Sequence, residues 1–226
     1  MREDVVPQRL SQPTHRFAFA GQRALDEVEG AAQLEEERED AQRALLLGND
    51  VETDLQAPED DASIDAEPGK IVHELRRGKA ARNWFERYYG TVDGTPLYLI
   101  LLSEVWRWTD DAALVRRFRE PALRALAWID EYGDRDGDGF VEYERRSESG
   151  LANQSWKDSW DSQRYSDGSL ADPPIAPVEA QGYVYDAKRR LAELAREVWR
   201  ERELAERLDR EADELRVRFD EAYWYE

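Results

Sequence analysis

One run of twelve residues, LYLILLSEVWRW at positions 97–108, limits what this chain can fold into more than any other part of it. A helix of this sequence carries apolar side chains nearly all round, so we expect it to be buried on every side. Thr95 and Pro96 come just before the run and are typical of a helix start, with a capping hydroxyl followed by proline. The run therefore predicts a central helix surrounded by other elements.

Helical periodicity continues beyond this run, and no segment shows sustained strand alternation. Asp110 or Asp111 is expected to cap the next helix, and Pro121 to kink or restart it. Two more helices close the chain, one ending at about Trp199 and one beginning at about Glu201. Buried and amphipathic helices alternate, with short turns on one side and long loops on the other. This order predicts an all-α fold of stacked helical hairpins, as in an α/α toroid or solenoid.

Three zones divide the chain. Residues 1–55 form an acidic N-terminal segment, in which 22–47 reads as one polar helix with a thin apolar stripe. Residues 56–69 are acidic and poor in large apolar side chains, which predicts a linker or mobile loop. Residues 70–226 carry the dense aromatic residues and the clear helices, and form the predicted helical domain.

Charge and composition argue against several classes of ligand, metal site and location. The formal net charge is −19 at pH 7, which argues against nucleic acid or an anionic membrane as a ligand. The chain has no cysteine, so disulfides and thiolate metal sites are excluded. No apolar run approaches the roughly 18 residues of a membrane span, and no signal peptide opens the chain. We therefore expect a cytoplasmic protein.

Positions 150–162, GLANQSWKDSWDS, place Asp158 between Trp156 and Trp160. An apolar ring beside a carboxyl raises its pKa, and aromatic faces beside acids and amides commonly hold sugar rings. Polar side chains that can orient the acid stand nearby, at Asn153, Gln154, Ser155 and Ser159. The alternative interpretation is a core tryptophan beside a helix cap.

The string DRDGDGFVE at 134–142 spaces oxygen ligands as a calcium loop does. Asp134, Asp136 and Asp138 take positions 1, 3 and 5, and Glu142 takes position 9. Position 12 is Arg145, where an EF-hand needs a bidentate glutamate, so an EF-hand switch is excluded. Two interpretations stay open: a structural Ca²⁺ loop with a ligand from elsewhere, or a turn whose carboxylates cap local amides.

Polar residues also stand at the expected mouths of two buried helices. Asp93 precedes the first, where it reads by default as a cap or turn residue, and Glu179 and Gln181 stand with Tyr183 at the start of another. Such groups would face a common cavity, where helix dipoles could help to hold hydroxyl groups. Caps and interhelical hydrogen bonds are the alternative.

Taken together, five strings in order resemble the catalytic domain of amylo-α-1,6-glucosidase and glycogen-debranching-like proteins, over about residues 60–220. These strings are PGKIVHELRRG (68–78), YYGTVDGTPLYLILLSEVWRWTDD (88–111), WIDEYGDRDGDGFVEY (128–143), GLANQSWKDSWDS (150–162) and PPIAPVEAQGYVYDA (173–187). The resemblance implies an inverting glycoside hydrolase with an (α/α)6 barrel, which cleaves α-glucosidic linkages of oligo- or polysaccharides and requires no cofactor.

The resemblance also implies roles for individual residues. Asp158 matches the general acid, which would protonate the leaving oxygen while a second carboxylate about 6.5–9.5 Å away activates water. Asp93 and Thr95 match a cavity-facing turn. The implied cavity-lining positions are Gln154, Trp156, Lys157, Glu179, Gln181 and Tyr183.

Two departures from the family pattern shape the functional expectation. Residues 1–55 do not resemble the family's GRDS-like segment, and the chain ends at Glu226, before the region of the family's catalytic glutamate. We therefore expect a truncated hydrolase that is incomplete for catalysis alone. The alternative is a helical carbohydrate-binding or interaction module without catalysis. In either case the open edge of the barrel would favour self-association.

Overall fold

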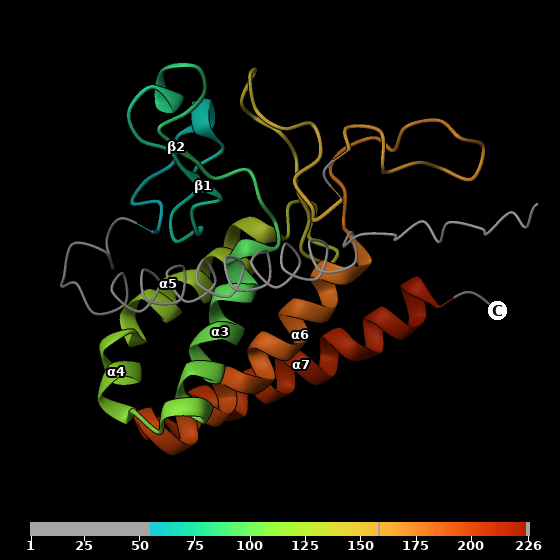
Figure 1. The fold of residues 1–226 in the computed structure, drawn as a ribbon. Coiled ribbons are helices and arrows are strands. Elements are labelled where there is room, and N and C mark those ends of the chain that lie inside the picture. Colours follow the sequence, from blue (N-terminus) through green and yellow to red (C-terminus); the bar gives the residue numbers. More distant parts are fainter. Residues whose placement is uncertain (1–54, 158, 225–226) are drawn as a thin grey trace, which may run out of the picture. The chain divides into compact units, whose positions relative to one another are not determined.

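The apolar run forms helix α3 (Gly94–Thr109) in the computed structural model, which describes residues 55–157 and 159–224 (Figure 1). The expected N-terminal segment and its polar helix over 22–47 lie outside the described residues, apart from Leu55. Burial on every side is a wrong prediction, because Leu97, Leu101 and Trp108 are 41%, 57% and 86% exposed. Within the described residues, helices pack on only part of the α3 surface.

The next helical stretch is interrupted, as predicted. Helix α4 (Ala112–Arg117) is capped by Asp111, whose Oδ1 accepts hydrogen bonds from two backbone N–H groups of the first turn at 3.0 Å. Helix α5 (Arg119–Trp128) restarts after Phe118 and carries Pro121 in its first turn, where no hydrogen bond within the helix is lost. A π-helical turn, Ile129–Gly133, ends it.

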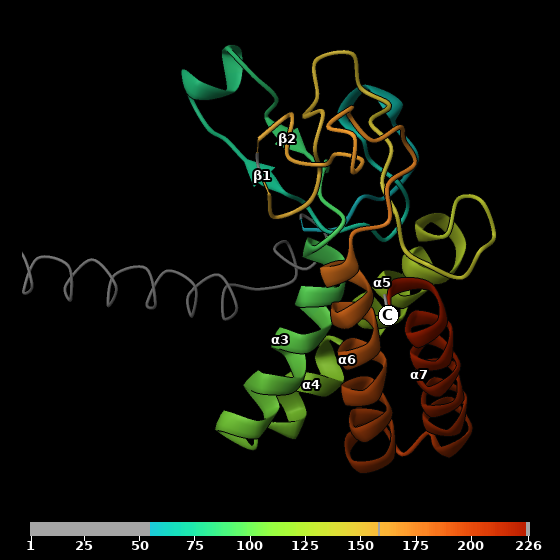
Figure 2. The same ribbon diagram turned by 90° about the vertical axis from the view of Figure 1, so that its right-hand side faces the viewer.

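Two long helices close the described chain at the expected positions. Helix α6 (Val178–Leu194) continues into a π-helical turn, Ala195–Trp199, and α7 is Arg202–Tyr223. The reversal between them occurs at Arg200, whose φ is 62°. Helix α6 packs against both α3 and α7, and Figures 1 and 2 show the three helices side by side. The fold is therefore helix-rich.

The remaining elements are short and lie in the long loops. Strands β1 (Glu74–Leu75) and β2 (Arg87–Tyr88) form an antiparallel pair in which Glu74 is opposite Tyr88, and the 3₁₀ turns are Ala62–Ile64 and Ala80–Arg82. These loops gather at the end where α3 and α6 begin (Figure 1). Every helix in the described part is too short or too polar to cross a lipid bilayer.

Residues 56–69 are not a linker. Gln56, Asp65 and Glu67 are at most 3% exposed. Gln56 Nε2 donates to the Pro121 carbonyl at 2.7 Å, and Trp128 Nε1 donates to Glu67 Oε2 at 2.8 Å. The acidic composition was misleading because these polar groups find partners far along the chain rather than in water.

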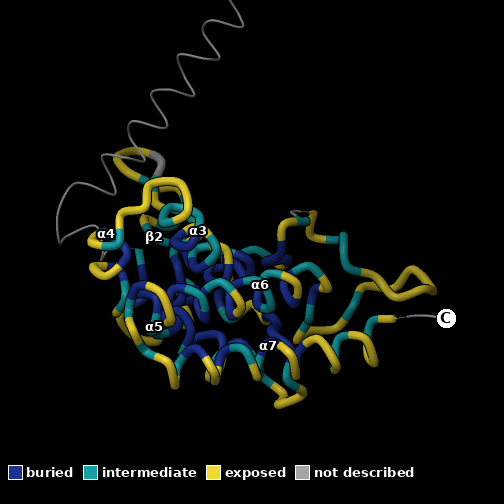
Figure 3. The backbone as a smooth tube through the Cα atoms, turned by 90° about the horizontal axis from the view of Figure 1, so that it is seen from below, coloured by how far each residue is buried: buried dark blue, intermediate teal, exposed yellow. Residues whose placement is uncertain are grey.

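The apolar core lies where α3, α4, α5, α6 and α7 meet, as the dark blue segments of Figure 3 show. Each of these helices contributes at least one side chain that is no more than 1% exposed: Leu99, Val115, Leu126, Leu191 and Leu208. The spacing of these residues follows the helical period, which is why the sequence alone located the helices. This core holds the first residues of α3 and α6 beneath the loops.

Candidate functional site

The candidate site forms where the starts of α3 and α6 meet the loop that precedes position 158. Asp93 immediately precedes α3, and Glu179 is the second residue of α6. The backbone N–H of Val92 donates to the carbonyl of Gln154 at 2.9 Å, which fixes the loop against the start of α3. Three segments that are distant in sequence therefore supply the polar groups of one site.

Asp93 is a buried carboxyl with spare hydrogen-bonding capacity. It is 7% exposed, and its Oδ1 has no hydrogen-bond partner among the described residues. Burial raises the pKa of Asp93 to about 6, the Trp156 backbone N–H opposes this rise, and the nearby charge of Glu179 adds to it. A carboxyl of this kind can exchange a proton near neutral pH.

Glu179 stays ionised through its neighbours. Burial alone would raise its pKa, but hydrogen bonds from its own backbone N–H, from Trp156 and from Lys157 lower it. Lys157 Nζ lies 3.4 Å from Glu179 Oε1 and 5.6 Å from the centre of the Trp156 ring. Trp156 itself is 57% exposed, so much of its ring remains open to a ligand.

Gln154 supplies a second buried acceptor. Its Nε2 donates to Asp65 Oδ2 at 3.0 Å, while its Oε1 has no partner in the described part of the chain. Buried oxygens without a donor are costly, and a ligand that brings hydroxyl donors removes this cost. Asp93 Oδ1 and Gln154 Oε1 are thus two buried acceptors without a donor among the described residues.

Asp158, the expected general acid, lies outside the described residues, but the side chain of Asn153 holds both of its neighbours. Asn153 Nδ2 donates to the Lys157 carbonyl and, at 3.4 Å, to the Ser159 carbonyl. Its Oδ1 accepts hydrogen bonds from the Tyr143 hydroxyl at 2.7 Å and the Ser155 backbone N–H at 3.0 Å. Sequence reasoning noted Asn153 only as a polar neighbour. The pattern Asn-x-Ser at 153–155 is typical of an Asx turn and is the sequence signal that could have identified this role.

Two predicted site residues serve the framework instead. Thr95 is fully buried inside α3, and its Oγ1 accepts the Ile71 backbone N–H at 3.1 Å, so it is not a helix cap. Gln181 is 1% exposed and bonds to the Val141 backbone in both directions, at 2.9 and 2.6 Å. Neither side chain is free to bind a ligand. Tyr183, one helical turn after Glu179, is half-buried and stays on the same face of α6.

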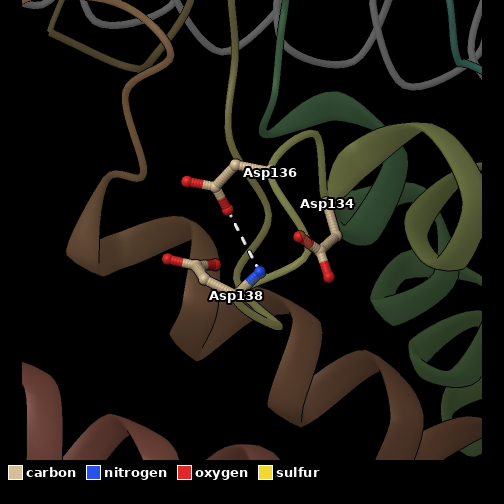
Figure 4. A group of neighbouring side chains, drawn as sticks. All are labelled: Asp134, Asp136 and Asp138. Carbon is tan, nitrogen blue, oxygen red and sulfur yellow. Dashed lines mark hydrogen bonds between the residues drawn. The ribbon is translucent and has the colours of Figure 1, made fainter.

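The acidic loop brings three of its four predicted ligands together. Asp134, Asp136 and Asp138 each place a carboxylate oxygen within 4.8 Å of the others (Figure 4). Each also accepts a backbone N–H of the loop: Asp134 from Gly137 at 2.8 Å, Asp136 from Asp138 at 3.1 Å, and Asp138 from Phe140 at 2.8 Å.

Glu142 does not join that group. It is 4% exposed, and its Oε1 accepts the backbone N–H groups of Arg135 and Asp136 at 2.9 and 3.0 Å. The three grouped aspartates, for their part, already accept backbone N–H groups of the loop. The geometry fits the alternative interpretation, in which the carboxylates cap the turn.

Asp65 is a residue that sequence reasoning missed. It is 1% exposed and accepts four hydrogen bonds, from the Tyr88 hydroxyl, Gln154 Nε2 and the backbone N–H groups of Arg146 and Ser147, at 2.7–3.0 Å. An aspartate within an acidic stretch gives no local signal of this role. Its carboxylate therefore holds Gln154, and with it the loop that precedes position 158, against Tyr88 and the backbone of residues 146–147.

Comparisons with known proteins add no relative. A scan against protein-family models found no match to the chain, and a search of curated proteins found none either. The sequence resemblance and the geometry of the site are therefore the support for a function.

Proposed function

We propose that this chain is a carbohydrate-active protein of the inverting glycoside hydrolase type, which takes α-glucosidic oligosaccharides at the starts of α3 and α6. One observation carries the proposal: Asp93 Oδ1 and Gln154 Oε1 are buried acceptors without donors among the described residues, and Asp93 accepts the backbone N–H of Trp156, whose side chain is 57% exposed. Sugar hydroxyls supply donors, and the apolar face of a sugar ring fits an indole face.

The catalytic role belongs to Asp158, through the resemblance. Its carboxyl group would protonate the leaving glycosidic oxygen, while a second carboxylate activates water on the opposite face of the ring. Helices α3 and α6 would be inner helices of an α/α toroid and α5 and α7 outer ones. The packing of α6 between α3 and α7, and the loops at one end, support this arrangement.

Calorimetric titration with maltotriose tests the binding site. We expect Asp93→Asn and Trp156→Ala each to weaken binding about tenfold, and Trp108→Ala, at the far end of α3, to leave it unchanged. Absence of binding by the unmodified chain, or unchanged binding by Trp156→Ala, would contradict the proposal. Release of β-glucose that Asp158→Asn abolishes would establish hydrolysis, whereas binding without release is the result expected both of a hydrolase incomplete for catalysis alone and of a carbohydrate-binding module.

A second candidate function, an interaction module, is favoured by the exposed apolar face of α3. Leu97 and Leu101 lie one turn apart on the same face of α3 and are 41% and 57% exposed, so they form a small apolar patch. Light scattering over a concentration series tests it, with Leu101→Lys as the disrupting variant. A monomer at every concentration counts against this candidate.

A further inference from the structure

The β1–β2 hairpin carries a charge opposite to that of the rest of the chain. Residues 74–87 contain five cations and two carboxylates, a formal charge of +3, whereas the whole chain carries −19 and the remaining residues therefore carry −22. Figures 1 and 2 show this hairpin projecting beyond the starts of the helices. We name residues 74–87 the basic hairpin, since they place a local positive field on an acidic molecule.

Three cations of the basic hairpin are unpaired. Arg77, Lys79 and Arg82 are exposed, and within the described residues their side chains form no ion pair or hydrogen bond. Arg76, by contrast, pairs with Glu74. The Arg82 backbone N–H donates to the Lys79 carbonyl at 3.3 Å, as in a 3₁₀ turn, so these two side chains stand on the same side of the turn. The unpaired cations are therefore grouped at the tip of the hairpin.

Aromatic rings hold the stem of the hairpin. The Arg76 guanidinium lies 5.6 Å from the centre of the Trp84 ring, and Phe85 stacks on Tyr88 with the ring centres 4.8 Å apart. The Arg76 backbone N–H donates to the Glu86 carbonyl at 2.9 Å. A tip carried on a fixed stem loses less conformational freedom on binding, so the stem presents the cations to a ligand in advance.

We propose that the basic hairpin binds a short segment rich in glutamate and aspartate on a partner protein. Arg77, Lys79 and Arg82 supply ammonium and guanidinium donors, and carboxylates are strong acceptors for such donors. The complementary charges would also steer the partner to the hairpin and away from the acidic remainder of the surface. This inference does not rest on the proposed function, because none of the three cations belongs to the candidate site.

The same observations favour an acidic peptide over a nucleic acid. A nucleic acid carries charge along its whole length, so a strand would extend from the hairpin over a surface that repels it. Single strands also need open aromatic faces on which their bases stack. Trp84 and Phe85 are half-buried, and each has a ring face or edge in contact with another side chain of the hairpin. A short peptide concentrates its charge where the cations are.

Fluorescence anisotropy of the full chain with a labelled polyglutamate peptide tests the inference. We expect binding that weakens as salt is added, because the cations are exposed. Arg77→Glu, Lys79→Glu and Arg82→Glu should each weaken it about threefold, and the triple variant about thirtyfold. Arg77→Lys, which keeps the charge, should retain the affinity. Arg216→Glu is the matched control, since Arg216 is an exposed arginine of α7 that is also unpaired within the described residues.

Two results would overturn the inference. One is absence of polyglutamate binding by the unmodified chain, or equal weakening by Arg216→Glu and the hairpin variants. The other is tighter binding of a labelled oligothymidylate than of polyglutamate, lost in the triple variant, which would assign the hairpin to nucleic acid. Melting temperatures check that every variant is folded. Polyglutamate binding by a chain that binds no maltotriose would support this inference and overturn only the proposed function.

Discussion

Asp65 and Gln154 are joined by a hydrogen bond of 3.0 Å from Nε2 to Oδ2, although 89 positions separate them in the sequence. The same Asp65 oxygen accepts the Tyr88 hydroxyl at 2.9 Å, and that hydroxyl accepts the Leu151 backbone N–H at 2.7 Å. The acidic segment 56–69 therefore fixes the position of the loop that carries the candidate site.

Removing the Asp65 carboxylate should be strongly destabilising. Asp65→Ala leaves four donors without their acceptor, and we expect a loss of at least about 3 kcal/mol in the free energy of unfolding. Urea denaturation measures it. Asp61→Ala is the control, since Asp61 is exposed and caps only a short 3₁₀ turn, and it should cost about 1 kcal/mol. Equal losses in the two variants would contradict the role of Asp65.

Asp93 should make stability depend on pH. Its pKa rises from 3.8 to about 6 on folding, so between about pH 4 and pH 6 the folded chain holds a proton that the unfolded chain has released. The contribution of Asp93 to the free energy of unfolding therefore falls as the pH rises through this window. Asp93→Asn should remove this fall and stabilise the protein at pH 7 by up to about 3 kcal/mol.

Thermal melts from pH 4 to pH 7 check the Asp93 prediction. Asp110→Asn, at the exposed C-terminal end of α3, is the matched control and should keep the pH dependence of the unmodified chain. If Asp93→Asn shows the same pH dependence as that control, the carboxyl is not held near neutrality by burial.

Asn153 should hold the loop around position 158 in place. Asn153→Ala removes the donor to the carbonyls of Lys157 and Ser159 and the acceptor of the Ser155 N–H. We expect amide exchange at Ser155 to accelerate about tenfold or more, with a stability loss of about 1–3 kcal/mol. Hydrogen-exchange mass spectrometry measures the exchange rate at Ser155 in Asn153→Ala and in a control variant, Asn83→Ala, which alters an exposed asparagine. Unchanged exchange at Ser155 would show that other contacts hold the loop.

Asp134 should stabilise its loop as a turn cap, with or without calcium. Asp134→Ala removes the acceptor of the Gly137 and Gly139 backbone N–H groups, at 2.8 and 3.0 Å, and should cost about 1–2 kcal/mol. Melts in EDTA and in millimolar Ca²⁺ should give the same loss. Asp167→Ala, which removes a similar cap on Ser169 in another loop, is the control. A Ca²⁺-dependent rise in melting temperature that Asp134→Ala alone abolishes would instead establish a metal loop.

The sequence by itself determined the helices. The end of the α6 stretch near Trp199, the start of α7 near Glu201 and the break before α5 follow from apolar periodicity and proline, and capping chemistry narrowed the α4 cap to Asp110 or Asp111. These signals act within a few residues of the chain, so they can be read without knowing the fold. The same local reasoning located the loop at 150–162 as the most distinctive polar and aromatic segment.

Only the tertiary structure decided which polar residues belong to the site. Gln181 looked like a cavity residue, yet it bonds to the backbone of Val141, 40 positions away. Asp65 looked like part of a solvated acidic run, yet it is buried against Gln154. A polar side chain has the same local pattern whether its partner is water, ligand or distant backbone, and packing alone supplies that partner. For the same reason, only the fold showed that Asp93 Oδ1 and Gln154 Oε1 are buried and have no hydrogen-bond donor among the described residues.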